Sequence, residues 1–281
     1  MRQLILQSFP DASGLSSLKD REYRYLAQVL RLAPGDVVEA RLPDGSLCPM
    51  LVAAVDRKAR TIGLQRIEGA PRNGLLAKRS DADVAPGESM PAAIALPDGF
   101  PRMVLFQWII KGPKMDQVIR QATEAGVEVI VPVSGERCLA SDADSVGEGK
   151  TGRWDRIVRE ARQQSGSPVP TRMASPIGVA DIAGTLASLS GDAPFGAIVL
   201  TEAPLARKSL HEYLCTQAGL MALAVGPEGG MTAKELEVLA SVGFESIHFR
   251  TNILRAETAA LYGIAAVQSA ITESEKWQLK E

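Results

Sequence analysis

The chain has 281 residues, of which 46% are hydrophobic and 5% aromatic, which is enough for two domains with buried cores. Its formal charge of −2 argues against a uniformly basic nucleic-acid-binding surface, although residues 1–72 hold 11 Lys and Arg against 8 Asp and Glu, a local +3. Three scattered cysteines without a C-x-x-C pattern predict a reducing compartment and no metal site, and no apolar run approaches the ~20 residues of a membrane span. We therefore expect a cytoplasmic protein without a membrane anchor.

The first 72 residues predict a small β-rich domain. A strand is expected at residues 2–8, and Ser17 with Asp20 predicts the start of a helix. Short strands follow at 37–41, 47–55 and 60–67, with Asp44 and Gly45 as a hairpin turn. A strand, a helix and a small meander together predict a compact barrel. Residues 73–99 are rich in Pro, Gly and Asp, which indicates a linker or a surface insertion.

From residue 100 to residue 281 strands alternate with helices. Apolar runs predict strands at 103–110, 128–133, 195–200, 221–225 and 246–249. Helical spacing follows from Met115 to Ala125, around Trp154 and from Glu257 to about Ile271, with an acidic loop expected at 141–152. This alternation predicts a mainly parallel sheet with helices on both faces. The pattern alone favours an unknotted doubly wound fold.

Two loops follow buried strands and precede helices. The first is Gly226-Pro227-Glu228-Gly229-Gly230, after which Thr232 and Glu235 form a capping box. The second is Asn252-Ile253-Leu254-Arg255-Ala256-Glu257-Thr258. Either loop alone could be an ordinary strand-to-helix turn. Because parallel strands end at one edge of a sheet, where α/β proteins bind ligands, the pair predicts a pocket.

These two loops resemble the signature loops of the small-subunit ribosomal RNA uridine-N3 methyltransferases, members of the SPOUT superfamily. Further matches are Lys114-Met115-Asp116, the run from Ala122 to Val127, Glu160-Ala161 and Gln164-Ser165-Gly166. The resemblance covers the chain except about residues 73–99. It implies a PUA-like RNA-binding β-barrel at 1–72, a linker at 73–99 and a methyltransferase domain with a deep trefoil knot at 100–281.

The resemblance also implies a function, namely transfer of a methyl group from S-adenosylmethionine to N3 of a uridine in 16S ribosomal RNA, in the assembled small subunit, by a homodimer. Arg255 is the candidate cation for stabilising the uracil anion and Glu257 the candidate base, although Glu257 could simply complement the helix dipole. Expected cofactor contacts are Leu200, Thr201, Glu202, Gly226, Pro227, Glu228, Gly229, Gly230, Ile253, Leu254, Arg255, Thr258 and Ala259. For Glu228 a structural role in the turn is favoured.

Candidate RNA contacts are Arg24, Arg31, Lys111, Lys114 and Ser165, although arginines such as Arg24 and Arg31 are often only a solvated helix face. The chain departs from the family pattern where Ser167 stands in place of an arginine and Gln163 in place of a glutamate. Another cation, such as Lys111, Lys114 or Arg172, is then expected to replace that arginine.

Three other functions remain open at this point. The same fold could methylate a ribose 2′-hydroxyl, or it could bind RNA as an assembly protein without catalysis. A nucleotide-binding regulator is disfavoured because no Walker A or G-x-G-x-x-G motif is present. The complete stretch from Leu254 to Thr258 favours uridine-N3 methylation.

Overall fold

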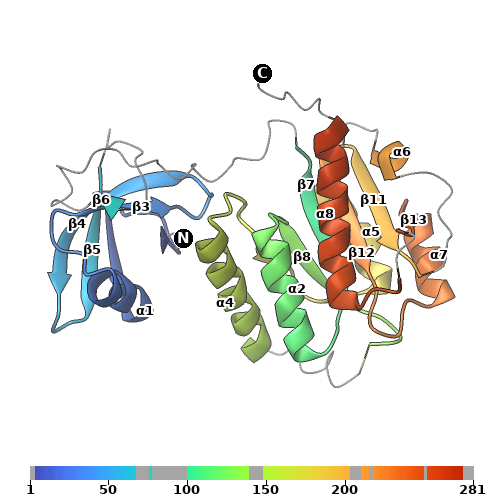
Figure 1. Ribbon diagram of the computed structural model, residues 1–281, viewed down its shortest axis with the longest axis horizontal. Coiled ribbons are helices and arrows are strands. Elements are labelled where there is room, and N and C mark those ends of the chain that lie inside the picture. The colour runs from blue at the N-terminus through green and yellow to red at the C-terminus, as the bar shows by residue number, and fades with distance from the viewer. Residues whose placement is uncertain are drawn as a thin grey trace. The chain divides into compact units, whose positions relative to one another are not determined.

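A computed structural model describes residues 4–67, 76–77, 100–138, 148–202, 210–214, 218–249 and 252–274 (Figure 1). The chain divides into two compact units. Unit 1 comprises Met1–Ala95 together with Arg162–Pro170, and unit 2 comprises Leu96–Ala161 together with Thr171–Glu281. The linker expected at 73–99 lies outside the described residues except for a short strand, β6 (Leu76–Ala77).

Unit 1 is built on one curved sheet with the strand order β1-β3-β4-β5-β2, and β6 pairs with β3. The strands are β1 (Leu4–Ile5), β2 (Leu15–Lys19), β3 (Val37–Arg41), β4 (Leu47–Asp56) and β5 (Thr61–Arg66). The three strands expected between residues 37 and 67 are confirmed, as is the hairpin turn, where Gly45 has a φ of +88°. Leu26, Met50, Ile62 and Leu64 are fully buried in the core of this unit.

The helix expected from Ser17 was predicted wrongly at its start. Ser17 and Leu18 belong to β2, where Leu18 pairs with Ile62 of β5. The helix begins at Asp20 as α1 (Asp20–Tyr23) and continues as a π-helix, η1 (Arg24–Val29). Pairing with β5 completes the edge of the sheet, and this tertiary contact outweighs the local capping signal.

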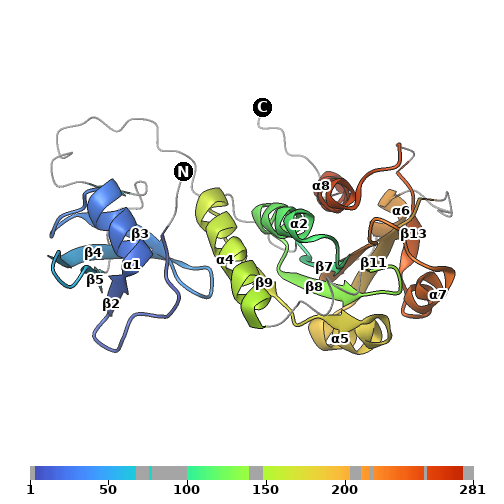
Figure 2. The same cartoon turned by 90° about the horizontal axis from the view of Figure 1, so that it is seen from below.

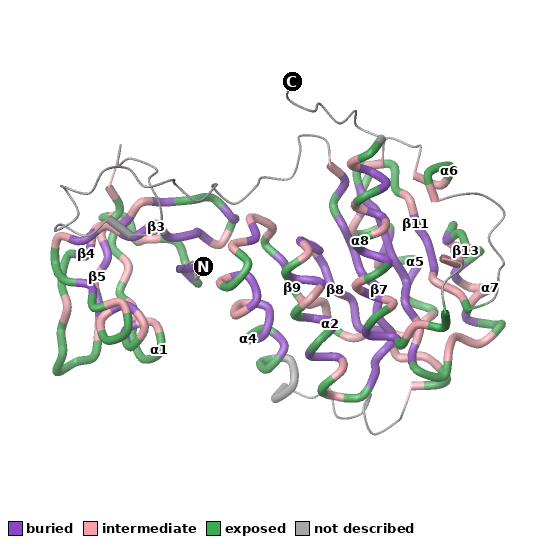
Figure 3. The backbone as a smooth tube through the Cα atoms, viewed as in Figure 1, coloured by how far each residue is buried: buried purple, intermediate pink, exposed green. Residues whose placement is uncertain are grey.

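Unit 2 contains a parallel sheet with the order β10-β8-β7-β12-β11-β13, and β9 pairs with β8. Every strand pair in it is parallel, which confirms the sequence prediction. The strands are β7 (Arg102–Trp108), β8 (Val129–Ser134), β9 (Arg172–Met173), β10 (Ile177–Gly178), β11 (Phe195–Leu200), β12 (Leu220–Val225) and β13 (Glu245–Ile247). Strands β7 and β8 are buried along most of their length (Figure 3).

Helices cover both faces of this sheet (Figure 2). On one face α2 (Gly112–Glu124), α4 (Glu148–Ser165) and α8 (Ala256–Ser274) pack in a core that includes Met115, Trp154 and Ile264. On the other face α5 (Ile182–Ser190) and α7 (Ala233–Ser241) pack through Leu186 and Leu239. Two short helices, η2 (Val179–Asp181) and α6 (Leu210–Leu214), complete the unit.

The helix boundaries differ from the prediction in two places. α4 begins at Glu148, inside the acidic segment expected to be a loop, and residues 139–147 of that segment lie outside the described residues. Helix α5 was not predicted, because its Gly, Ser and Thr content gives a weak helical pattern. It forms because Ile182 and Leu186 cover the sheet. In the part of the chain that the structure describes, no helix is long and apolar enough to cross a membrane.

Candidate active site

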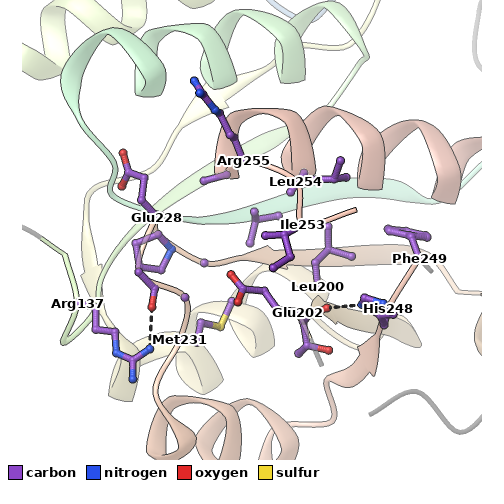
Figure 4. A pocket seen from close by; sticks show the side chains of 18 of the residues that line it. Arg137, Leu200, Glu202, Glu228, Met231, His248, Phe249, Ile253, Leu254 and Arg255 are labelled. Atoms are coloured by element: carbon purple, nitrogen blue, oxygen red, sulfur yellow. Dashed lines mark hydrogen bonds between the residues drawn. The ribbon is translucent and has the colours of Figure 1, made fainter. Parts of the chain in front are cut away.

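A cavity of about 520 Å³ opens at the carboxyl edge of the parallel sheet of unit 2 (Figure 4). Its walls come from the ends of β11, β12 and β13 and from the loops that follow them. The lining residues are Lys114, Arg137, Leu200, Thr201, Glu202, Val225, Gly226, Pro227, Glu228, Gly229, Gly230, Met231, Leu236, Ile247, His248, Phe249, Asn252, Ile253, Leu254, Arg255, Ala256 and Ala259. The two loops singled out in the sequence therefore meet in one pocket.

The first loop is held by its own backbone and by the helix after it. Gly230 has a φ of +68°, which side chains rarely tolerate, and its N–H donates to the carbonyl of Pro227 at 2.9 Å. The capping box is confirmed: the N–H of Thr232 donates to Glu235 Oε2 at 2.7 Å, and the N–H of Glu235 donates to Thr232 Oγ1 at 3.3 Å. The C-terminal end of the glycine loop is thus fixed to α7.

The second loop runs from Asn252 into α8. The N–H groups of Thr258 and Ala259 donate to the carbonyl of Arg255 at 2.9 and 2.7 Å and close the first turn of the helix. Ile253 and Leu254 face the cavity, whereas Thr258, an expected cofactor contact, does not line it. Every other residue expected to contact the cofactor does line the cavity.

The end of β11 supplies the third wall. The N–H of Thr201 donates to the carbonyl of Ile247 at 3.0 Å, and His248 Nδ1 lies 3.1 Å from the carbonyl oxygen of Thr201. His248 follows β13 and lines the cavity, although its sequence position indicated an ordinary strand residue. These contacts tie the β11 and β13 ends together beside the pocket.

Sequence reasoning missed Arg137, which also lines the cavity. Its Nη1 donates to the carbonyl of Gly229 at 2.7 Å (Figure 4). The segment that carries it is fixed by Glu235, whose Oε1 accepts from Trp108 Nε1 at 2.9 Å and from the N–H of Glu136 at 3.1 Å. Arg137 lies just after β8, so its place at the carboxyl edge of a parallel strand is the one signal that could have identified it.

Glu235 is 3% exposed and belongs to no expected functional set. Burial by itself raises the pKa of its carboxyl group. Hydrogen bonds from Trp108, from the N–H groups of Thr232 and Glu136 and within the capping box outweigh that effect and leave the pKa below its ordinary value. The carboxylate thus links β7, the segment after β8 and α7.

Lys114, in the first turn of α2, lies between two carboxylates. Its Nζ is 3.0 Å from Glu228 Oε1 and 4.0 Å from Glu257 Oε2. Burial alone raises the pKa of the Glu228 carboxyl, but hydrogen bonds from its own N–H, from Lys114 and from the N–H of Lys111 leave it lowered, with help from the charge of Lys114. Lys114 therefore joins the glycine loop to α8.

The two expected catalytic residues differ in their surroundings. The guanidinium of Arg255 is exposed at the rim and points away from the cavity interior (Figure 4), and it makes no hydrogen bond or ion pair within the described residues. Glu257 is 8% exposed and does not line the cavity. Its Oε2 has no hydrogen-bond partner among the residues described. The ammonium nitrogen of Lys114 lies 4.0 Å from this oxygen.

Of the expected RNA contacts, Lys114 lines the cavity and Lys111 directly precedes α2. Arg24, Arg31 and Ser165 belong to unit 1 and do not line it. Within the described ranges, no group of three or more His, Cys, Asp or Glu side chains could hold a metal ion.

A family model described as an RNA methyltransferase domain matches residues 98–268. This match covers more than half of the chain and includes every residue that lines the cavity. The chain therefore belongs to the RNA methyltransferase domain family.

The chain is similar to proteins named ribosomal RNA small subunit methyltransferase E. With that of Mycobacterium bovis (strain ATCC BAA-935 / AF2122/97) it is 28% identical over 267 residues, 93% of this chain and 89% of that one. With that of Aquifex aeolicus (strain VF5) it is 32% identical over 152 residues, 52% and 59% of the two chains. The crystal structure of the Neisseria gonorrhoeae methyltransferase E bound to S-adenosylmethionine has the same fold, with a TM-score of 0.69, 23% identity and coverage of 96% and 97%.

Proposed function

We propose that this protein transfers a methyl group from S-adenosylmethionine to N3 of a uridine in small-subunit (16S) ribosomal RNA. The observation that carries the proposal is that the two signature loops meet in one cavity at the carboxyl edge of the sheet. The similarity to small-subunit methyltransferases along nearly the whole chain supports the choice of RNA.

The residues of the cavity fit this cofactor. Leu200, Ile247 and Leu254 provide apolar walls for an adenine ring, and backbone groups of the glycine loop are available for hydrogen bonds to it. Glu202 and Glu228 bring negative charge to a cofactor that is positive at its sulfonium and amino groups. S-adenosylmethionine supplies an activated methyl group on its sulfonium sulfur, so the protein contributes position and electrostatics.

The methyl acceptor must be activated, because uracil N3 carries a proton at neutral pH and must lose it to become nucleophilic. We assign Arg255 to the stabilisation of the negative charge that develops on the uracil oxygens. Its exposed guanidinium at the rim, without a protein partner among the described residues, supports this role. Glu257 is the candidate for accepting the N3 proton, and its Oε2 without a hydrogen-bond partner in the described part of the chain supports that choice.

The finer fold assignment is also a proposal. The parallel order of unit 2 and the curved sheet of unit 1 are compatible with a trefoil-knotted SPOUT domain at 100–281 and a PUA-like RNA-binding barrel at 1–72, joined by 73–99. Tracing the chain in a crystal structure tests the knot. Arg24 and Arg31 in the barrel and Lys111 beside the cavity are the proposed phosphate contacts, and their loss should lower RNA affinity most at low salt.

We further propose a homodimer that acts in the cytoplasm on the assembled small subunit. Ile253 in the second loop is 76% exposed and Tyr262 in α8 is 43% exposed, and these exposed apolar side chains support a contact surface. A C2 dimer is the commonest way to cover such a surface. Light scattering that gives a monomer with full activity at micromolar concentration would contradict the dimer.

Nucleoside mass spectrometry of ribosomal RNA tests the function itself. Cells that lack the protein should lose one 3-methyluridine from 16S RNA, and the wild-type gene should restore it. Loss of a 2′-O-methylated nucleoside instead would assign the fold to ribose methylation. Unchanged RNA would contradict catalysis and support a binding role.

A further inference from the structure

Two arginines are buried beside each other in unit 1. Arg41, the last residue of β3, is 3% exposed, and Arg162, in the last turn of α4, is 8% exposed. Nε and Nη2 of Arg162 have no hydrogen-bond partner within the described residues. Buried donors in proteins are almost always bonded, so these two donor nitrogens require an explanation.

The two arginines lie where two surface turns are joined. The guanidinium of Arg41 donates to the carbonyl of Gly45 in the β3–β4 hairpin and, at 3.2 Å, to the carbonyl of Gly166 after α4. A side chain at Gly45 would overlap the carbonyl oxygen of Pro168, so the two turns are in close contact. This packing holds Arg162 and Arg41 together although the hairpin and the turn are 125 residues apart.

The charge of Arg162 is not balanced by a carboxylate at ion-pair distance in the part of unit 1 that the structure describes. Burial lowers the pKa of Arg162, and the charge of Arg41 lowers it further. Burial also lowers the pKa of Arg41, against the opposite effect of Glu39. The nearby Asp44 carboxylate accepts from the N–H and hydroxyl of Ser46 at 2.9 and 2.7 Å.

An ordered water could satisfy the open N–H groups of Arg162, but it would not balance the charge. A buried cation next to another cation is costly unless an anion compensates it. The planar guanidinium matches the oxygens of a phosphate group in a two-point contact. A carboxylate would match it in the same way, so the missing partner has the chemistry of an oxyanion, which in an RNA ligand is a backbone phosphate.

We propose that Arg162, with Arg41 beside it, forms a phosphate-binding site in unit 1 and that a backbone phosphate of the RNA substrate occupies it. The turn Ser165–Pro170 forms its outer wall. Gln164 and Ser165 at the end of α4 and Asp44 and Ser46 in the hairpin turn are exposed, so in this proposal a phosphate reaches Arg162 by displacing exposed segments and not the core. The oxyanion chemistry of the ligand rests on the arginines, whereas its identity as an RNA phosphate rests on the proposed function.

The decisive variant is Arg162→Met, which keeps the apolar stem and removes the charge. In sodium chloride the full-length variant should melt at or above the wild-type temperature, because an uncompensated buried charge is gone. Its affinity for a small-subunit RNA fragment should fall about tenfold near 0.1 M salt, and the slope of log affinity against log salt should become shallower by about one.

Arg156→Met is the matched control. Arg156 lies on the same helix, is 60% exposed and has its charge 4.0 Å from Glu160, so its loss should leave RNA affinity and salt slope unchanged. Arg162→Lys keeps the charge without the planar fork and should retain the slope with weaker affinity. If Arg156→Met and Arg162→Met lowered RNA affinity equally, the effect would be one of general surface charge, and the proposed phosphate site would be wrong.

A second experiment distinguishes inorganic phosphate from the RNA backbone as the ligand of the site. Wild-type and Arg162→Met proteins are melted in sodium phosphate and in sodium chloride of equal ionic strength. A wild-type gain in phosphate that the variant loses shows that inorganic phosphate also enters, whereas an RNA effect alone assigns the site to the RNA backbone. A variant that is destabilised in chloride, or one with unchanged RNA affinity, overturns the proposal. Cofactor titration of the same variant separates this failure from a failure of the methyltransferase assignment, because Arg162 is not part of the cofactor cavity.

Discussion

Lys114 in unit 2 and Arg162 in unit 1 are both cations near the end of a helix, but their surroundings are opposite. Lys114 lies between the carboxylates of Glu228 and Glu257, whereas Arg162 lies beside the cation of Arg41. A cation between carboxylates holds parts of the protein together. A cation without a carboxylate in the described structure contributes little to the fold and is available to a negatively charged substrate.

Arg255 provides a third case within the same pocket as Lys114. It lies at the cavity rim, yet its guanidinium has no partner among the described residues. In lacking a carboxylate partner there it resembles Arg162 and not Lys114, although Arg255 is exposed and Arg162 is buried. The comparison therefore predicts which substitutions lower RNA methylation and which lower stability.

The largest expected effect is that of Arg255→Ala. If this cation stabilises the uracil anion, single-turnover methylation should fall by about 10²–10³ while folding and cofactor affinity are unchanged. Arg255→Lys should restore part of the rate, because charge remains and the planar fork is lost. The alanine variant should recover partly at higher pH, where more uracil is already ionised. A wild-type rate at neutral pH would remove Arg255 from the mechanism.

The next largest effect should come from Glu235→Ala, which tests a charged side chain that has partners within the protein. The substitution leaves the buried N–H of Trp108 and the N–H groups of Thr232 and Glu136 without their acceptor. We expect the free energy of unfolding, measured with urea, to fall by about 2–4 kcal/mol. Cofactor affinity should fall as well, because the segment that carries Arg137 is no longer fixed.

Glu235→Gln is the matched control for that change. The amide keeps one acceptor oxygen and the side-chain volume. The loss of unfolding free energy should therefore be about half of that in the alanine variant. Equal stability of the alanine variant and the wild type would show that the network around Glu235 does not support the loop.

The smallest effect is expected for Lys114→Met. Its partner Glu228 is 36% exposed at the side chain, so solvent screens the pair and the loss of stability at pH 7 should be at most about 1 kcal/mol. Because the pKa of Glu228 is lowered in the folded protein, its contribution is present above the unfolded pKa and disappears as pH falls through the folded pKa. The difference between wild type and variant should therefore shrink below about pH 4.

Urea unfolding of both proteins from pH 3 to pH 7 measures this difference. A gap that does not change with pH would mean that the ion pair with Glu228 does not stabilise the loop. A loss of methylation without any loss of stability would instead place Lys114 with Arg255 among the cations that act on the substrate.

Most of the helices and strands, and the two loops of the site, could be predicted from the amino-acid sequence. Apolar alternation, the glycines from Gly226 to Gly230 and the Thr232–Glu235 capping box are local signals, and they describe local conformation correctly because each involves residues a few positions apart. Parallel strands with consecutive loops were enough to predict that Glu228 and Leu254 would face one pocket.

The way in which distant segments meet could not be predicted and depends on the tertiary fold. The strand order places Arg137 against Gly229, 92 residues away in the chain, and Lys114 between Glu228 and Glu257. In the folded chain Ser17, predicted at the start of a helix, belongs to β2, and Arg162 lies beside Arg41. Residue periodicity records which face of an element is buried, but not which element covers it. The partners of these charges, and hence their roles, therefore depend on the folded chain.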